Sequence, residues 1–171
     1  MLTNTYLDAL RTIHDRLKDT DINWVITGSV GFVLQGIDVA VHDIDLQTDR
    51  EGAYDIERIF ANYILRPVQF SSTDSIRSHF GAFELNGIKV EIMGDIQKRL
   101  DDQSWEAPPD LNKLKCWIER DGMRLPVLSL AYEYQAYLKL GRLEKAALLE
   151  KHLVHPVQNP GDAQHQQRDN E

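Results

Sequence analysis

The sequence has a single cysteine, no long apolar run and fewer basic than acidic residues, and each shortage excludes a class of protein. Cys116 alone cannot form an internal disulfide and has no cysteine partner for a zinc site. Charged residues interrupt every apolar stretch within a few positions, which argues against a membrane-spanning helix. The N-terminal segment also lacks the basic start and apolar block of a signal peptide. We therefore expect a cytoplasmic protein with no membrane partner.

The charge balance argues against an extended nucleic-acid-binding surface. The chain has 19 Lys and Arg against 27 Asp and Glu, a formal net charge of −8, whereas such surfaces are built from clustered Lys and Arg. A small-molecule partner is favoured instead, and an acidic surface would suit a cationic substrate. A homodimer or a partner protein is also compatible with this composition.

The spacing of apolar residues predicts one α/β domain over residues 1–154. The 171 residues, 42% of them hydrophobic, suffice for one core. Helical spacing predicts helices at 5–17, 30–36 and 50–64, and a long C-terminal helix over 130–153. Strands are predicted at 22–27, 42–48, 79–85, 88–93, 115–120 and 123–129, with hairpin turns at Asn86-Gly87 and Asp121-Gly122. This order favours a mixed sheet flanked by helices. Residues 155–171 carry almost no apolar side chains, so we expect a disordered C-terminal tail there.

Two aspartates stand two residues apart in the segment "DIDL". The apolar residues Ile44 and Leu46 alternate with Asp43 and Asp45, as in a half-buried strand. Both aspartates should then project from the face opposite the core. Carboxylates held this close repel one another unless they face water, share a proton or bind a cation.

A third acid is expected beside the two aspartates. In "IKVEIM" the residues Val90 and Ile92 fall on one face of the strand and Glu91 on the other. If the apolar faces share a core, Glu91 lies on the same side of the sheet as Asp43 and Asp45. Three carboxylates form an all-oxygen site that suits Mg²⁺ and not zinc. The alternative is that these are solvated acids on exposed strand faces.

The segment "WVITGS" predicts an anion site near these acids. The segment predicts a strand that is followed by Gly28 and Ser29 and then by a helix. Glycine allows close approach of the backbone, and a helix N-terminus offers free N–H groups to an anion. Alone, the Gly-Ser pair would indicate only a turn with a helix cap. Because it stands next to a predicted metal site, the Gly-Ser pair favours a phosphate-binding site.

Together these segments resemble the nucleotidyltransferase superfamily of the DNA polymerase β type, and within it the small bacterial members related to the antibiotic nucleotidyltransferases. The resemblance rests on "VITGS", "DIDL", "VEIM" and "LSLAYEYQAYLKLGR", and it spans residues 24–142. It implies a nucleotidyltransferase-like fold. It also implies a metal-dependent enzyme that moves a nucleoside monophosphate from an NTP such as ATP to a hydroxyl acceptor, with a small molecule favoured as the acceptor.

The resemblance also implies roles for individual residues. Asp43 and Asp45 would bind Mg²⁺, and Glu91 would be either a further metal ligand or the general base. Gly28 and Ser29 would bind the β- and γ-phosphates. The candidates for nucleotide-binding cations are Lys139, Arg142 and Lys89.

Two other functions stay open at this stage. The same chemistry could act on a protein or an RNA, as part of a toxin-antitoxin or defence pair. The chain could also be a nucleotide-binding member without turnover. That alternative is raised by the run "DVAVHD", because members of the superfamily often carry an Arg and small hydroxyl residues just before the first acid.

Overall fold

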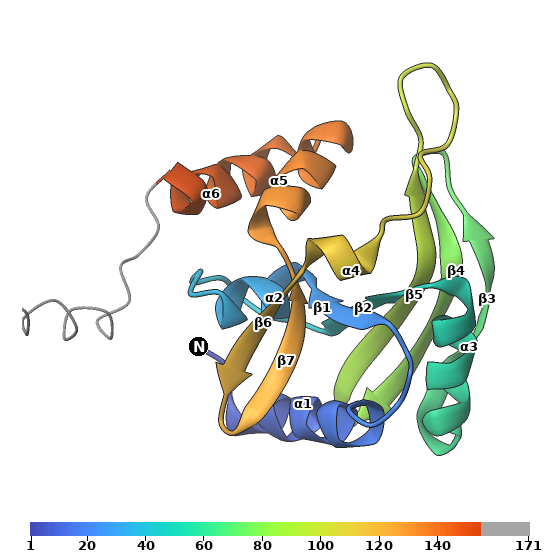
Figure 1. The fold of residues 1–171 in the computed structure, drawn as a ribbon, viewed down its shortest axis with the longest axis vertical. Helices are drawn as coiled ribbons and strands as arrows, with labels where there is room; N and C mark the ends of the chain where they lie inside the picture. The colour runs from blue at the N-terminus through green and yellow to red at the C-terminus, as the bar shows by residue number, and fades with distance from the viewer. Residues whose placement is uncertain (155–171) are drawn as a thin grey trace, which may run out of the picture.

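The computed structural model describes residues 1–154, which form one seven-stranded mixed sheet with helices packed against it (Figure 1). The predicted α/β class and mixed sheet are therefore confirmed. The predicted disordered tail, residues 155–171, lies outside the described residues. The strands are β1 (Trp24–Thr27), β2 (Ile44–Thr48), β3 (Ile64–Ser72), β4 (Ile76–Leu85), β5 (Ile88–Lys98), β6 (Lys115–Arg120) and β7 (Met123–Leu128). The helices are α1 (Asn4–Leu17), α2 (Gly28–Leu34), α3 (Arg50–Ile59), α4 (Leu111–Leu114), α5 (Leu130–Lys139) and α6 (Leu143–Val154), with a 3₁₀ turn at Ala61–Tyr63.

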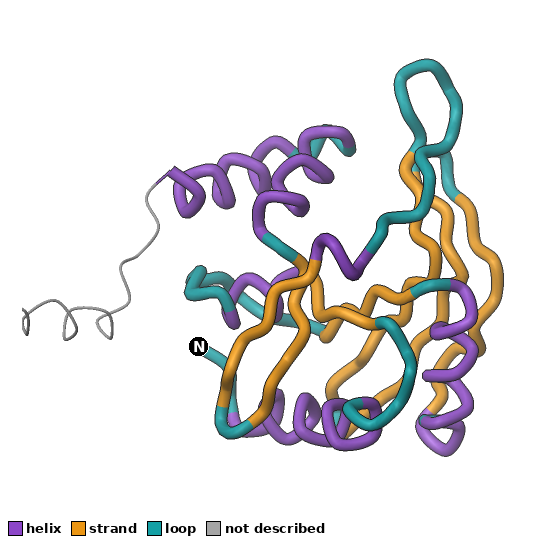
Figure 2. Tube along the Cα trace, viewed as in Figure 1, coloured by secondary structure: helices purple, strands orange, loops and turns teal. Residues whose placement is uncertain are grey.

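The strands lie in the order β3-β4-β5-β2-β1-β7-β6, and Figure 2 shows them as one twisted layer. β2 runs parallel to β5 and β1 parallel to β7, while the other neighbours are antiparallel. Both predicted hairpins form, at Asn86-Gly87 and Asp121-Gly122. All four turn residues have positive φ, as a two-residue turn between right-twisted strands requires.

The core lies on the face of the sheet that α1 and α3 cover. Leu10 and Ile13 of α1 and Ile56 of α3 are fully buried in one cluster with strand residues such as Leu46 and Ile92. In Figure 1, α1 runs below the sheet and α3 lies beside β3, β4 and β5. The sequence alternation therefore places residues 44, 46, 90 and 92 in the core and turns their neighbours to the opposite face.

Several elements differ from the sequence prediction. The helix predicted over 50–64 ends at Ile59, and the short helix α4 was not predicted. β3 was not predicted, because Pro67 and several polar residues interrupt its apolar pattern. β3 is an edge strand, where proline is tolerated since no partner needs its missing N–H group. The long C-terminal helix predicted over 130–153 is instead two helices, α5 and α6. Gly141 breaks it with a φ of +67°, a conformation that glycine adopts without strain.

Within residues 1–154, no helix is both long enough and apolar enough to cross a bilayer.

Candidate active site

The pairing of β2 with β5 brings the three predicted acids together. Asp45 stands directly opposite Glu91 in the parallel register, and Asp43 immediately precedes β2. Each of Asp43, Asp45 and Glu91 offers one carboxylate oxygen, and these oxygens all lie within 4.8 Å of one another. The predicted convergence of the three acids is therefore present in the structure.

The charge of this cluster is poorly compensated. Burial, together with the negative charges of Asp43 and Glu91, raises the pKa of Asp45 to about 7. The Lys89 ammonium lies 2.5 Å from Glu91 Oε1 and 3.5 Å from Asp43 Oδ2, and the hydrogen bond to Glu91 raises the pKa of Lys89. Lys89, a candidate nucleotide-binding cation, thus pairs with the acids. The negative charge of the cluster thus attracts one cation, the Lys89 ammonium, to its edge.

The donor set fits a divalent metal ion. All three donors are partly buried carboxylates, and no His or Cys belongs to the group. Within residues 1–154 no other group of three His, Cys, Asp or Glu side chains meets the same spacing. Hard oxygen donors of this kind bind hard divalent cations, and a bound cation would offset the repulsion that raises the Asp45 pKa.

Gly28 makes room for the cluster. Its φ is +66°, and a Cβ atom at this position would lie 2.3 Å from Asp45 Oδ2. The glycine is thus required by the close approach of the Asp45 carboxylate as well as by its backbone conformation. Its N–H group donates to Glu133 Oε1 at 3.1 Å, so that amide is not free for a phosphate. Ser29, the other predicted phosphate-binding residue, lines the adjoining cleft.

Glu133 of α5 is a site residue that the sequence analysis missed. Only 3% of it is exposed, and its Oε1 accepts hydrogen bonds from the Thr27 hydroxyl and the Gly28 amide. Among the residues that the structure describes, 1–154, none forms a hydrogen bond with its Oε2. Burial raises the pKa of Glu133 to about 7, and the negative charge of Asp45 contributes in the same direction. The sequence holds no signal for this role, since a lone acid on a helix ordinarily faces solvent.

A cleft of about 780 Å³ opens over the acids. Its floor comes from β2 and β5, and its walls come from β3 and β4 on one side and from α2, α5 and α6 on the other. Arg142, a predicted nucleotide-binding residue, lines the cleft. Lys139 does not, because its ammonium turns to the Glu106 carboxylate. The sequence analysis missed four basic residues of the lining: Arg66, Arg77, Lys98 and Lys145.

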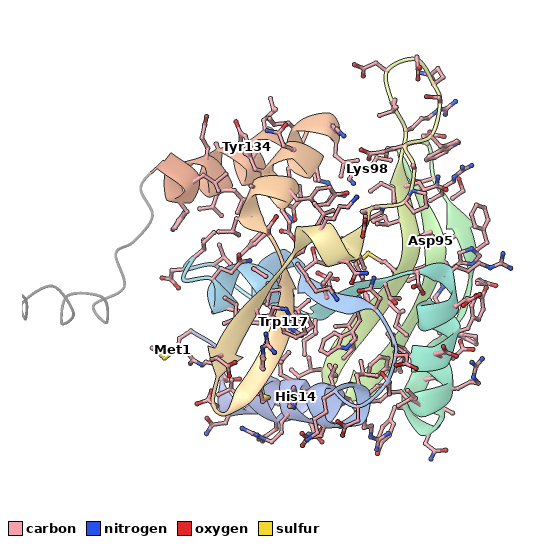
Figure 3. The ribbon with its side chains drawn as sticks, viewed as in Figure 1. Met1, His14, Asp95, Lys98, Trp117 and Tyr134 are labelled. Carbon is pink, nitrogen blue, oxygen red and sulfur yellow. The ribbon has the colours of Figure 1, made fainter. Side chains whose placement is uncertain are left out.

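These basic residues were missed because their positions depend on long-range pairing. Lys98 faces the cleft because the β4–β5 pairing shifts register between Arg77 and His79, where Asp95 adopts a φ of +48°. Its ammonium donates to the Tyr132 hydroxyl of α5 at 3.2 Å, and Figure 3 labels Lys98 where β5 approaches α5. A bulge of this kind leaves no periodic signal in the sequence.

The mixed sheet and the three acids beside a Gly-Ser turn agree with the nucleotidyltransferase class that the sequence resembles. The sequence model of the aminoglycoside-2''-adenylyltransferase family matches residues 9–151. The chain therefore belongs to the aminoglycoside-2''-adenylyltransferase family, and it is an enzyme of the nucleotidyltransferase class. A comparison with the curated proteins finds no match.

Solved structures agree with this assignment. The chain is 62% identical to a candidate nucleotidyltransferase from Thermotoga maritima, with a TM-score of 0.81 over 90% of this chain and 96% of that one. The lincosamide adenylyltransferase LnuA, solved with lincomycin, is 14% identical with a TM-score of 0.53, over 87% of this chain and 97% of that one. The enzyme ANT(2'')-Ia, solved with adenylyl-2''-tobramycin, is 12% identical with a TM-score of 0.57, over 88% and 90%. At these two low identities the likeness concerns the fold.

Proposed function

We propose that this enzyme uses Mg²⁺ and transfers a nucleoside monophosphate from an NTP to a hydroxyl group of a small molecule. The observation that carries the proposal is the cluster of Asp43, Asp45 and Glu91, with oxygens within 4.8 Å of one another beside the Gly28-Ser29 turn. The cleft volume of about 780 Å³ lies in the range of small-molecule sites. The acceptors in the LnuA and ANT(2'')-Ia structures, lincomycin and tobramycin, are small molecules too.

The triphosphate would lie on the Gly28-Ser29 side of the acids. Ser29, Arg142 and Lys145 all line the cleft. Burial raises the pKa of both Asp45 and Glu133, and the positive charge of Lys145 offsets a small part of each rise. A hydroxyl and two cations suit the charge and the oxygens of a triphosphate. The acceptor would then approach from the other side, along β5, where Glu91 lies.

The three acids and the basic residues Arg142 and Lys145 would have different roles in the reaction. Asp43 and Asp45 would bind Mg²⁺, which when bound neutralises charge on the triphosphate and on the departing pyrophosphate. The acceptor oxygen would form a bond to the α-phosphorus as the bond from that phosphorus to the bridging oxygen of pyrophosphate breaks. Glu91 would either complete the metal site or take the proton that the acceptor hydroxyl loses. Arg142 and Lys145 would hold the leaving phosphates.

A screen for pyrophosphate release tests the proposal. Each of the four NTPs is incubated with the enzyme, Mg²⁺ and a library of hydroxylated small molecules. We expect release that depends on Mg²⁺, on one preferred NTP and on a subset of acceptors. Transfer only to a co-purifying protein or RNA would overturn the small-molecule acceptor. Nucleotide binding without any pyrophosphate would overturn the transferase reaction.

A further inference from the structure

The half of the cleft assigned to the acceptor is basic. Residues of β3, β4 and β5 and of the turn that joins β3 to β4 form this half, which we call the acceptor arm. The arm carries three cations, contributed by Arg66, Arg77 and Lys98. Four hydroxyl side chains lie among them: Ser71, Thr73, Ser75 and Ser78. This composition contrasts with the net charge of −8 of the chain as a whole.

The charges of two of these cations are not compensated by acids. The Arg77 guanidinium lies 4.5 Å from the centre of the Trp105 ring and donates to the neutral Gln97 Oε1 at 2.9 Å. The Arg66 guanidinium lies 4.8 Å from the centre of the Phe80 ring. Within residues 1–154, neither has a carboxylate within 4.0 Å.

The third cation differs from these two. Lys98 lies 3.6 Å from Glu106 Oε2 and is only 6% exposed, so its charge is largely compensated. Arg66 and Arg77 therefore supply the free positive charge of the arm.

The acids that line the cleft are all engaged elsewhere. Asp43, Asp45 and Glu91 form the candidate metal site, and Glu133 is bonded to the turn that contains Gly28. Apart from Glu91, which belongs to the candidate metal site, the arm contributes no carboxylate to the lining within residues 1–154. A polycationic acceptor would thus place its ammonium groups against guanidinium groups, with no acid in the arm to receive them other than Glu91 of the candidate metal site.

From this arrangement we infer, on the basis of the proposed transferase reaction, that the acceptor is an anionic hydroxyl compound, a sugar phosphate or sugar acid, and not a polycationic aminoglycoside. Guanidinium groups pair with phosphate and carboxylate oxygens through two parallel hydrogen bonds, which fixes position as well as supplying affinity. Arg66 and Arg77 hold the anionic group, and the acceptor hydroxyl points to Glu91. The enzyme thus selects an acceptor opposite in charge to the tobramycin seen in the ANT(2'')-Ia structure.

Calorimetry with four hexoses of similar size tests the inference without requiring turnover. The probes are glucose, glucosamine, glucuronate and glucose 6-phosphate, each titrated into the full-length protein with Mg²⁺ and α,β-methylene-ATP. We expect glucuronate or glucose 6-phosphate to bind about tenfold or more tightly than glucose, and glucosamine to bind more weakly than glucose. Comparison of the two anions shows whether a carboxylate or a phosphate is preferred. Added salt should weaken anion binding.

Variants of Arg66 and Arg77 test whether the preference for anions arises in the acceptor arm. Arg66→Gln and Arg77→Gln should each lower affinity for the preferred anion about tenfold and leave that for glucose unchanged. The double substitution of both arginines by Glu should reverse the preference toward glucosamine. Arg124→Gln, on the remote strand β7, is the matched control and should change nothing. Melting temperatures of all variants show whether the fold is kept, and Arg66→Gln removes no hydrogen bond that the structure contains.

Several outcomes would overturn the inference. The first is that neither anion binds more tightly than glucose. The second is that folded Arg66→Gln keeps the parental preference. The third is that these variants lose α,β-methylene-ATP affinity to the same extent, which would assign the arginines to the triphosphate. Anion preference without pyrophosphate release from any acceptor would instead overturn the transferase reaction while supporting the anionic site.

Discussion

Asp45→Asn should stabilise the metal-free enzyme at neutral and alkaline pH. The substitution replaces a carboxylate by an amide of the same shape and removes one of three crowded negative charges. In the folded protein, burial and the charges of Asp43 and Glu91 raise the Asp45 pKa from 3.8 to about 7. Asp45 therefore contributes stability that is fully present below the unfolded pKa of 3.8 and is lost as pH rises through about 7.

The size of the effect follows from this pKa. Each unit of pKa displacement is worth about 1.4 kcal/mol, so the full penalty of ionising Asp45 in the fold is about 4 kcal/mol above pH 7. Between about pH 5 and about pH 8 the penalty grows by about 2–3 kcal/mol. The amide does not titrate, so the variant gains this amount on the parent over the same interval. A chain of this size gains about 2–4 °C per kcal/mol, which makes the expected rise about 5–10 °C.

Thermal unfolding in EDTA, with parent and variant compared at both pH values, measures this gain. The difference between the two proteins removes the part of the Glu133 contribution that comes from burial, the largest cause of its raised pKa, and keeps the smaller part that comes from the charge of Asp45. Asp19→Asn, an exposed aspartate in the loop after α1, is the control and should show no such pH-dependent gain. Saturating Mg²⁺ should then stabilise the parent and not Asp45→Asn, since ligand binding to the folded state raises its melting temperature. If the difference in melting temperature between parent and Asp45→Asn were the same at both pH values, the reasoning about the crowded carboxylates would be refuted.

Three further predictions follow from the site and the chain. Gly28→Ala should abolish stabilisation by Mg²⁺, because its Cβ would lie 2.3 Å from Asp45 Oδ2, whereas Gly36→Ala, with a φ of +88° and no atom within 4 Å of its Cβ, should keep it. Glu91→Gln should lower turnover about a hundredfold and spare nucleotide affinity, with the exposed Glu84→Gln as the control; parental turnover would remove Glu91 from the mechanism. Deletion of residues 155–171, which carry almost no apolar side chains, should leave melting temperature and turnover unchanged, and a large fall in either would show that the segment contributes.

The sequence was sufficient to predict the face on which the three acids lie, because this depends on the local alternation of apolar and acidic residues. Ile44 and Leu46, like Val90 and Ile92, must face the core, and this turns Asp43, Asp45 and Glu91 to the other face once the strands pair in register. The Asn86-Gly87 turn is equally local, because its two positive φ values select the residues that form it. The face of each acid and the turn could be predicted without knowledge of the strand order, whereas the meeting of Glu91 with the aspartates also required β5 to lie beside β2.

The remainder of the cleft depends on contacts between distant segments. Glu133 reaches Thr27 across 106 positions of sequence, and its burial follows from the packing of α5 over the turn. Lys98 faces the cleft only because a bulge shifts the register of β5. Arg66 lies on β3, whose proline and polar residues conceal the strand. The basic character of the acceptor arm was therefore beyond sequence reasoning, which had associated the acidic composition with a cationic substrate.

The transfer of label from ATP marked at the α-phosphate tests the central claim most directly. The enzyme is incubated with this ATP, Mg²⁺ and an acceptor found in the screen, and the labelled product and pyrophosphate are quantified together. The three-acid site predicts that label enters the acceptor with one pyrophosphate released for each transfer. It also predicts that EDTA and Asp45→Asn both abolish the transfer. Release of the terminal phosphate alone, or transfer that persists in EDTA or in Asp45→Asn, would contradict metal-dependent nucleotidyl transfer at Asp43, Asp45 and Glu91.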